Sequence, residues 1–400
     1  MTTDRIGKKR AKEPNRWSNR SNLQTDAKRW VIKIGSSLLT NDGQHLDTTA
    51  IRAWVQQILQ LHQRGVEVVL VSSGSVSAGM QRLGWTDRPV SLKARQAAAS
   101  VGQSALIHTY EKMLQECAQP ENDRLYCGQV LLTHDDLRTR RRYLNARSTL
   151  RTLLDMNVLP IINENDVVSY SAINLGDNDT LAALVSNLLD ADILVILTDQ
   201  TGLFEADPRS HPEATLLTEV GAGDPMLERI AGGCGSRIGT GGMLAKVRAA
   251  ARAARSGTST IIADGRSPEV LPRLQQGEAI GTFVHARLPK LAARKRWLAG
   301  HLRSHGVLHL DQGAARAILE EGSSLLPVGV IAVEGTFRRG DLVLCKDPLG
   351  RDIARGLINL DAPVAARCCR KQSHELADDP EVLEDVLIHR DNLVINDLLL

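Results

Sequence analysis

Short runs of aliphatic and β-branched residues alternate with helical periodicity over the first 283 residues. The runs are apolar throughout, and we assign strands to residues 30–34, 66–71, 130–132, 158–162, 193–197 and 260–263. Strands of this kind are buried on both faces, which is typical of a mostly parallel sheet covered by helices. Between the first two runs, the apolar spacing predicts a helix over 48–64 that ends at Gly65. The pattern therefore predicts an α/β fold, a three-layer sandwich with a mostly parallel sheet.

The alternation of apolar strands with helical periodicity ends after Phe283. A charged stretch at 290–296 precedes short strands separated by glycine turns, at 307–310, 329–333, 341–345 and 394–395. This change predicts a small β-rich domain joined by a linker. We divide the chain into a tail at 1–28, an α/β domain at 29–286, a linker at 287–304 and a β-rich domain at 305–395.

The first 28 residues are rich in Lys, Arg, Asn and Ser and nearly devoid of large aliphatics. Such a segment cannot form a core, so we expect a disordered basic tail. A transit peptide is the alternative, but Asp4, Glu13 and Asp26 and the missing apolar face argue against it.

Composition narrows the class of protein. With 400 residues, 42% of them hydrophobic, and a net charge of +3, the chain lacks the strong basicity of a dedicated nucleic-acid binder. Its six cysteines include no C-x-x-C pair, which favours reduced thiols in the cytosol. No run reaches the roughly 18 to 20 apolar residues that span a bilayer. We expect a cytoplasmic protein that is neither secreted nor embedded in a membrane.

Glycine-rich and polar segments follow the predicted strands directly. Lys33-Ile34-Gly35-Ser36-Ser37 follows the first strand and Ser72-Ser73-Gly74-Ser75 the second. Asn163-Glu164-Asn165-Asp166 follows another strand, and Gly176-Asp177-Asn178-Asp179-Thr180 opens a helix. Parallel sheets bind ligands at the carboxyl ends of their strands. Flexible turns and a solvated acidic loop remain the alternatives, but the position favours a polar binding site.

Two further segments indicate a phosphate site. Thr198-Asp199 leaves a buried strand, and the glycine run 239–242 precedes a helix that carries Lys246 in its first turn. Backbone donors, the helix dipole and a lysine charge together favour a phosphate. No Walker A motif is present. The spacing His389-Arg390-Asp391 to Asn396 fits a protein-kinase catalytic loop, but no D-F-G accompanies it, so we predict a turn before a terminal strand.

In this order the motifs resemble the amino-acid kinase family, and within it the branch that phosphorylates glutamate. The motifs that carry the resemblance lie at 33–37, 71–74, 143–147, 162–166, 176–179, 197–199, 206–209 and 239–246. It covers about residues 29–286. The C-terminal segment resembles a PUA module through Gly313, Ala314, the run 322–327 and the run 337–341.

The resemblance implies transfer of the γ-phosphoryl group of ATP to the side-chain carboxylate of L-glutamate, the first step of proline biosynthesis. A carboxylate with a pKa near ~4.3 is already ionised, so catalysis needs positive charge rather than a general base. Lys33 and Lys246 would flank the transferring group, and Asp179 would orient both lysines. The backbone amides of Gly35 and Gly74 would complete the cradle.

The resemblance also implies which of the remaining residues bind each substrate. Glutamate would be bound by Ser73, Asp166 and Asn178, with the acid pairing with the ammonium group. ATP, with Mg²⁺ as cofactor, would be held by Lys33, Thr198, Asp199, Thr240, Gly241, Gly242, Met243, Leu244, Ala245 and Lys246. No protein metal ligands are assigned.

The sequence departs from the family pattern at Ala172, Asn174, Phe204 and Ala245, none of which is a proposed catalytic charge. Ala245 removes a hydroxyl from the phosphate loop. A homo-oligomer and feedback inhibition by proline are further expectations, whereas RNA binding by the PUA-like domain has no support in the sequence. The alternatives are a sibling kinase that acts on acetylglutamate and a non-enzymatic RNA-associated scaffold.

Overall fold

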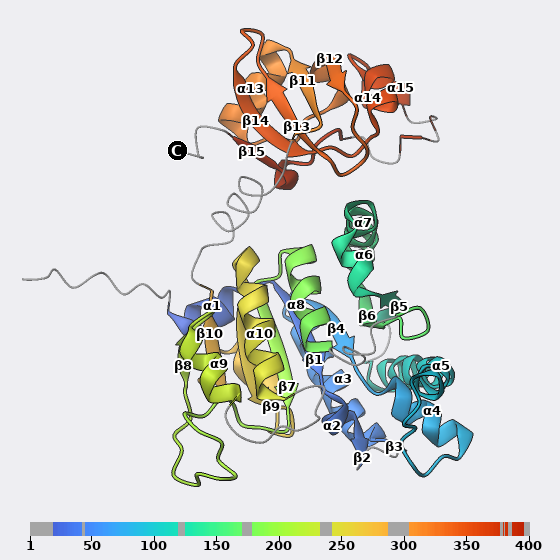
Figure 1. The fold of residues 1–400 in the computed structure, drawn as a ribbon, viewed down its shortest axis with the longest axis vertical. Helices are drawn as coiled ribbons and strands as arrows, with labels where there is room; N and C mark the ends of the chain where they lie inside the picture. The colour runs from blue at the N-terminus through green and yellow to red at the C-terminus, as the bar shows by residue number, and fades with distance from the viewer. Residues whose placement is uncertain are drawn as a thin grey trace, which may run out of the picture.

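The computed structural model describes residues 19–41, 45–118, 125–169, 178–232, 242–286, 304–376, 379, 381–382 and 386–395. Within these residues the chain forms an eight-stranded sheet, a five-stranded sheet and a two-stranded hairpin. Figure 1 shows the larger sheet with its helices in blue to yellow and the smaller sheet in orange and red. The two-part organisation and the mostly parallel α/β class are confirmed.

The larger sheet has the strand order β5-β6-β4-β1-β7-β9-β10-β8. Neighbouring strands run parallel except for β9 and β10, which pair antiparallel. The strands are β1 (Arg29–Ile34), β4 (Glu67–Ser72), β5 (Tyr126–Leu132), β6 (Val158–Glu164), β7 (Ile193–Thr198), β8 (Glu219–Gly221), β9 (Ser259–Asp264) and β10 (Thr282–His285). All six predicted strands are present; β8, β10 and the hairpin of β2 (Thr40–Asn41) and β3 (His45–Leu46) were not predicted.

Successive side chains of each strand point to opposite faces, so apolar strands give this sheet two apolar faces. Helices cover both of them. On one face Trp30, Ile32 and Ile34 pack under α3 (Thr48–Gln63), α5 (Leu92–Cys117) and α11 (Val270–Gln275). On the other face Val31 and Val69 pack under α7 (Arg140–Asp155), α8 (Asn178–Leu189) and α10 (Met243–Ala253). The predicted helix at 48–64 is therefore α3, and Gly65 follows it with a φ of 77°.

Shorter elements connect these layers. They are α2 (Ser36–Leu39), α4 (Ser75–Leu83), α6 (His134–Arg138), α9 (Pro225–Gly232) and the 3-10 turn η1 (Ala254–Ser256). Helix α2 follows β1, α4 follows β4 and α6 follows β5, all at the carboxyl ends of their strands. The sheet thus delivers several helix starts to one edge, as expected of parallel α/β folds.

The expectation of disorder over residues 1–28 is wrong for its last part. Arg20–Asp26 form helix α1, and residues 1–18 lie outside the described residues. The Arg20 side chain donates to the carbonyl oxygens of Thr218 and Ile280 and lies over the Phe283 ring. Gln24 is fully buried and donates to the Leu274 carbonyl. These partners are far away in sequence, so local composition cannot predict them.

The smaller sheet has the order β12-β11-β13-β14-β15 and a core of its own, separate from the larger sheet's two clusters. Its strands are β11 (Gly306–Leu310), β12 (Val330–Gly335), β13 (Leu342–Lys346), β14 (Asp352–Leu357) and β15 (Leu393–Ile395). Around them lie α13 (Gln312–Glu321), α14 (Ala362–Cys368), α15 (Ser373–Leu376), η2 (Pro327–Gly329) and η3 (Arg390–Asn392). Strand β14 was missed. The predicted linker lies almost wholly outside the described residues, so the exact domain boundaries stay predictions.

Side-chain hydrogen bonds between described residues join the parts. Arg147 of α7 donates to Asn392 Oδ1 at 2.5 Å, and Arg339 donates to Asn145 Oδ1 at 2.7 Å. Arg147 also pairs with Asp190, which follows α8, at 2.6 Å. Helix α7 therefore contacts the C-terminal domain and the helix that carries Asn178 and Asp179.

Candidate active site

Four adjacent strands of the larger sheet, β6, β4, β1 and β7, bring the predicted site residues to one edge. Gly35 follows β1, Ser73 and Gly74 follow β4, and Asp166 follows β6. Thr198 ends β7, and Asp199 comes next. Because these strands are parallel, their carboxyl ends lie at the same edge. The sequence prediction of a common site at this edge is consistent with this geometry.

A buried ion triad lies at the centre of the site. Lys33 Nζ lies 2.6 Å from Asp179 Oδ1, and Lys246 Nζ lies 2.9 Å from Asp179 Oδ2. The three side chains come from β1, α8 and α10 and are 7%, 1% and 6% exposed for Lys33, Asp179 and Lys246. Burial raises the pKa of Asp179, but the two lysines lower it more strongly, so its pKa lies below the usual range. One carboxylate thus holds two ammonium groups side by side.

The loops beside this triad are shaped by glycine. Gly74 has a φ of 101°, a conformation that strains any residue with a Cβ atom, and it precedes the first turn of α4. At Gly35, a Cβ atom would lie 3.5 Å from the Lys33 ammonium nitrogen. The Gly35 loop therefore brings backbone close to the Lys33 ammonium group, whereas the Gly74 loop packs against Leu39 and Leu46.

Helix α4 is held in place by a very close crossing with α5. A Cβ atom on Gly102 would lie 1.9 Å from the Ser75 carbonyl oxygen, and one on Gly79 would lie 1.8 Å from the Ala98 carbonyl oxygen. Only glycine permits this approach of the two backbones. The crossing fixes the start of α4, and with it Ser73 and Gly74.

A chain of amides runs from α5 to the start of α8. Asn163 donates to Gln103 Oε1 at 2.8 Å, and Asn178 donates to Asn163 Oδ1 at 3.0 Å and to Ser73 Oγ at 2.9 Å. Asn178 is 3% exposed, and its Oδ1 has no hydrogen-bond partner among the described residues. A buried acceptor without a donor is unfavourable. This oxygen is therefore available to a donor group of a ligand.

Acidic side chains lie where β6 ends. Asp166 is 8% exposed. Burial and the neighbouring charge of Glu164 raise its pKa to about 6, although a hydrogen bond from Ser75 acts in the opposite direction. Gln96 of α5 donates to the Asp166 and Ser169 carbonyl oxygens at 2.9 and 3.1 Å, which anchors the turn to α5. The turn thus presents a buried acid that forms no ion pair with any of the residues that the structure describes.

The segments predicted to hold a nucleotide are only partly described. Thr198 is buried and donates to Asp199 Oδ1 at 3.1 Å. Gly242 precedes α10, whose first turn contains Met243, Leu244, Ala245 and Lys246. Thr240, Gly241 and the segment Gly176–Asp177 lie outside the described residues, as do the departures Ala172 and Asn174.

Residues 28–264 match the amino acid kinase family, and residues 306–378 match the PUA domain. A glutamate 5-kinase of Methylobacillus flagellatus is 54% identical over 381 residues, covering 94% of this chain and 100% of the relative. A glutamate 5-kinase of Chromobacterium violaceum is 55% identical over 367 residues, covering 92% and 97%. The chain belongs to the amino acid kinase family. Both predicted resemblances are confirmed.

The metal-binding capacity of the site is judged from the described residues. No group of three or more His, Cys, Asp or Glu side chains suited to a metal occurs in the described part of the chain. Both oxygens of Asp179 already contact lysines. Asp179 therefore has no oxygen left without a lysine contact.

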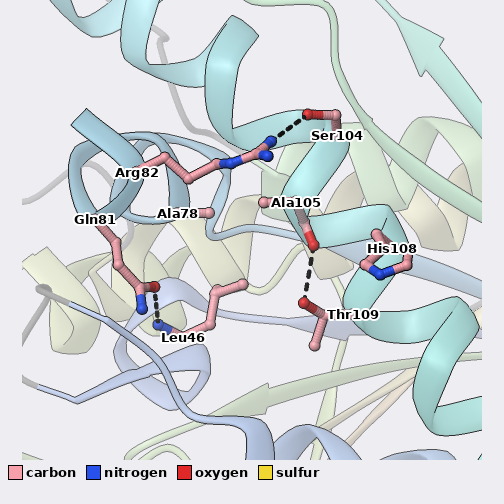
Figure 2. Close-up of a pocket in the computed structure, with 8 residues that line it drawn as sticks. All are labelled: Leu46, Ala78, Gln81, Arg82, Ser104, Ala105, His108 and Thr109. Carbon is pink, nitrogen blue, oxygen red and sulfur yellow. Dashed lines mark hydrogen bonds between the residues drawn. The ribbon is translucent and has the colours of Figure 1, made fainter.

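A surface hollow of about 730 Å³ lies between α4 and α5. Its lining residues, drawn in Figure 2, include Arg82, Ser104 and His108. Arg82 already donates to Ser104 Oγ at 3.0 Å. None of the predicted site residues lines the hollow, so it is separate from the candidate active site.

The sequence did not predict the residues that hold the site residues in place through hydrogen bonds and charge contacts. Gln96 and Gln103 lie within α5, and Tyr110 shares a hydrogen bond of 2.9 Å with Ser72. His134 begins α6 near Glu164. Their partners are distant in sequence, so the available signal was a polar residue within an otherwise apolar helix pattern.

Within the described residues, no helix is long and apolar enough to cross a membrane.

Proposed function

We propose that this chain transfers the γ-phosphoryl group of ATP to the side-chain carboxylate of L-glutamate, which yields glutamyl 5-phosphate and ADP. Relatives named glutamate 5-kinase, 53% to 55% identical over 92% to 94% of this chain, support the substrate. The observation that carries the chemistry is the triad of Lys33, Asp179 and Lys246. The product would enter proline biosynthesis.

The lysine pair suits phosphoryl transfer to a carboxylate. The acceptor is ionised at neutral pH, so the barrier is set by repulsion between two anions. Lys33 and Lys246 supply positive charge, while Asp179 holds both ammonium groups within 2.9 Å of its oxygens. The triad carries a net charge of about +1, which would attract the anionic group that is transferred. The contacts with Asp179 would keep both lysines aligned meanwhile.

Each substrate has its own part of the edge. The loops at Gly35 and Gly74 would offer backbone donors to the phosphoryl group between the lysines. ATP, as its Mg²⁺ complex, would lie toward Thr198, Asp199 and the start of α10. Magnesium would neutralise phosphate charge and align the phosphates for in-line transfer.

The amino-acid end would lie toward β4 and β6. Asp166 would contact the ammonium group, and Ser73 and Asn178 would orient the carboxylate and ammonium groups of glutamate. An N-acetyl group removes the positive charge, and would leave Asp166 buried without a counter-ion. This argument favours free glutamate over N-acetylglutamate.

A substrate panel tests the proposal. Purified chain with ATP and Mg²⁺ should release ADP with glutamate, and only weakly with N-acetylglutamate or aspartate. Equal turnover of N-acetylglutamate would move the assignment to a sibling kinase. Absence of any amino-acid-dependent ADP release would favour the non-enzymatic scaffold.

Further expectations concern the protein's setting. A reaction that consumes ATP and makes an amino-acid precursor belongs in the cytoplasm, and cell fractionation checks this. A homo-oligomer and inhibition by proline stay predictions, for which gel filtration and ADP release with added proline are the measurements. RNA binding by the PUA domain likewise stays a prediction.

A further inference from the structure

Glu164 is a buried acid to which the proposed reaction has so far given no role. Its side chain is 3% exposed, and its Oε1 accepts a hydrogen bond of 2.8 Å from Ser169 Oγ. Its Oε2 has no hydrogen-bond partner among the described residues. A buried carboxylate oxygen without a donor costs free energy.

The nearest acid is Asp166, two residues along the same turn. The turn is closed by hydrogen bonds of 3.2 and 3.1 Å from the Val168 and Ser169 amides to the Asn165 carbonyl oxygen. Glu164 acts on Asp166 through its negative charge. Two carboxylates in a dry site repel each other, and a cation that enters beside them removes that cost.

We propose that Glu164 sets the charge of the ammonium subsite and so determines specificity for amino acids with a free α-ammonium group. This inference rests on the proposed function. Asp166 contacts the ammonium group, and Glu164 acts through Asp166 as a positioning and specificity-determining residue. A free ammonium group relieves the repulsion between the two acids, whereas the neutral amide of an N-acyl substrate leaves it in place.

The groups that face this pair come from several elements. Ser75 of α4 and Gln96 of α5 contact the Asp166 residue, and both are uncharged. His134 of α6 lies with Nδ1 3.9 Å from Glu164 Oε1 and is 22% exposed. In the described ranges, His134 is thus the basic side chain that pairs with Glu164.

The pH dependence of kcat/KM for glutamate, measured by ADP release, reports on Asp166 in the free enzyme. Because the pKa of Asp166 is raised to about 6, kcat/KM of the wild type should fall as the pH drops through about 6. The side chain of free glutamate titrates at about 4.3, well below the pH at which kcat/KM is expected to fall. The two titrations can therefore be separated.

Glu164→Gln removes the like charge and keeps the shape. The fall of kcat/KM at acid pH, the acid limb of the profile, should then move to lower pH. Part of the raised pKa of Asp166 should remain, because burial is its larger cause. At pH 8 the KM for glutamate should rise roughly tenfold, because one attractive charge is lost. The preference for glutamate over N-acetylglutamate should fall by a similar factor, with kcat for glutamate little changed.

His134→Arg provides a second variant that leaves Glu164 intact. A permanent positive charge beside Glu164 should offset its effect on Asp166, and the limb should again move to lower pH, by a smaller amount. Glu67→Gln is the matched control, since Glu67 starts β4 at the opposite end of the sheet and pairs with Arg29. This control should keep the wild-type limb, KM and substrate preference.

The outcomes separate the inference from the proposed function. Limbs unchanged in both Glu164→Gln and His134→Arg would overturn the role of Glu164, even with a fully active wild type. A lower kcat in Glu164→Gln with unchanged pH profile and unchanged substrate preference would show a merely structural role and would also overturn it. Failure of the proposed function would appear differently, as a wild type without glutamate-dependent ADP release.

Discussion

Replacing Asp179 by Asn tests the ion triad most severely. The substitution keeps the size of the side chain but removes the charge that lies 2.6 and 2.9 Å from two ammonium groups. Both lysine side chains are less than a tenth exposed, so water cannot replace the lost partner. Removing one partner of a buried pair costs about 3–5 kcal/mol. That is a large share of the about 5–15 kcal/mol by which a domain is stable.

Urea unfolding followed by tryptophan fluorescence measures this loss. All five tryptophans precede residue 300, and Trp30 and Trp54 are buried in the larger sheet's core. The signal therefore follows the kinase domain. The unfolding midpoint of Asp179→Asn should fall markedly, while kcat should drop by roughly 10²-fold because the lysines lose their alignment. Glu278→Gln, which breaks the exposed pair with Arg273, should stay near the wild type.

A ligand adds a second readout. ATP with Mg²⁺ brings negative charge to the two lysines, so it should raise the midpoint of Asp179→Asn by more than it raises that of the wild type. The reasoning fails if Asp179→Asn unfolds at the wild-type urea concentration and retains wild-type kcat. Such a result would mean that the lysines are solvated in solution and aligned by other groups.

Four further variants have defined outcomes. Lys33→Ala and Lys246→Ala should each lower kcat by roughly 10² to 10⁴-fold with a much smaller rise in KM for glutamate, and a variant with near wild-type kcat would remove that lysine from the mechanism. Gly102→Ala drives a Cβ atom to within 1.9 Å of the Ser75 carbonyl oxygen, so it should cost about 1–3 kcal/mol by thermal melting and raise KM for glutamate; an unchanged KM would contradict the positioning role of the crossing. A chain that ends at Ala286 keeps every proposed catalytic residue and should retain glutamate-dependent ADP release; a well-folded but inactive truncation would show that the C-terminal domain completes the site.

Most of the strands that the sequence predicted in the larger sheet are buried on both faces, although the edge strand β5 is largely exposed. β1, β4, β6, β7 and β9 read as apolar runs because helices cover each side of the sheet. Strand β14 was missed because it contains Asp352, Arg355 and Gly356, and its hydrogen bonds depend on β13 and β15 rather than on its own composition. A strand whose pairing partners define it cannot be found from local pattern alone.

The candidate site divides in the same way. Residues at strand ends, such as Lys33, Ser73 and Asp166, could be predicted because their place in the sheet follows from the strand that precedes them. Gln103 and His134 could not, since each acts through a partner more than 25 residues away in the chain. Helix α1 was called disordered for the same reason, because its buried Arg20 is bound by carbonyl groups that only the folded sheet provides.

The central claim is phosphorylation of the side-chain carboxylate of free glutamate. The most direct measurement is to incubate the purified chain with ATP, Mg²⁺, glutamate and hydroxylamine, and to identify the product by mass spectrometry and NMR. Hydroxylamine converts an acyl phosphate to a hydroxamate at the carbon that carried the phosphate. The account predicts the 5-hydroxamate of glutamate in an amount equal to the ADP released, and much less hydroxamate when N-acetylglutamate replaces glutamate. ADP release without hydroxamate, or hydroxamate formed equally well from N-acetylglutamate, would contradict it.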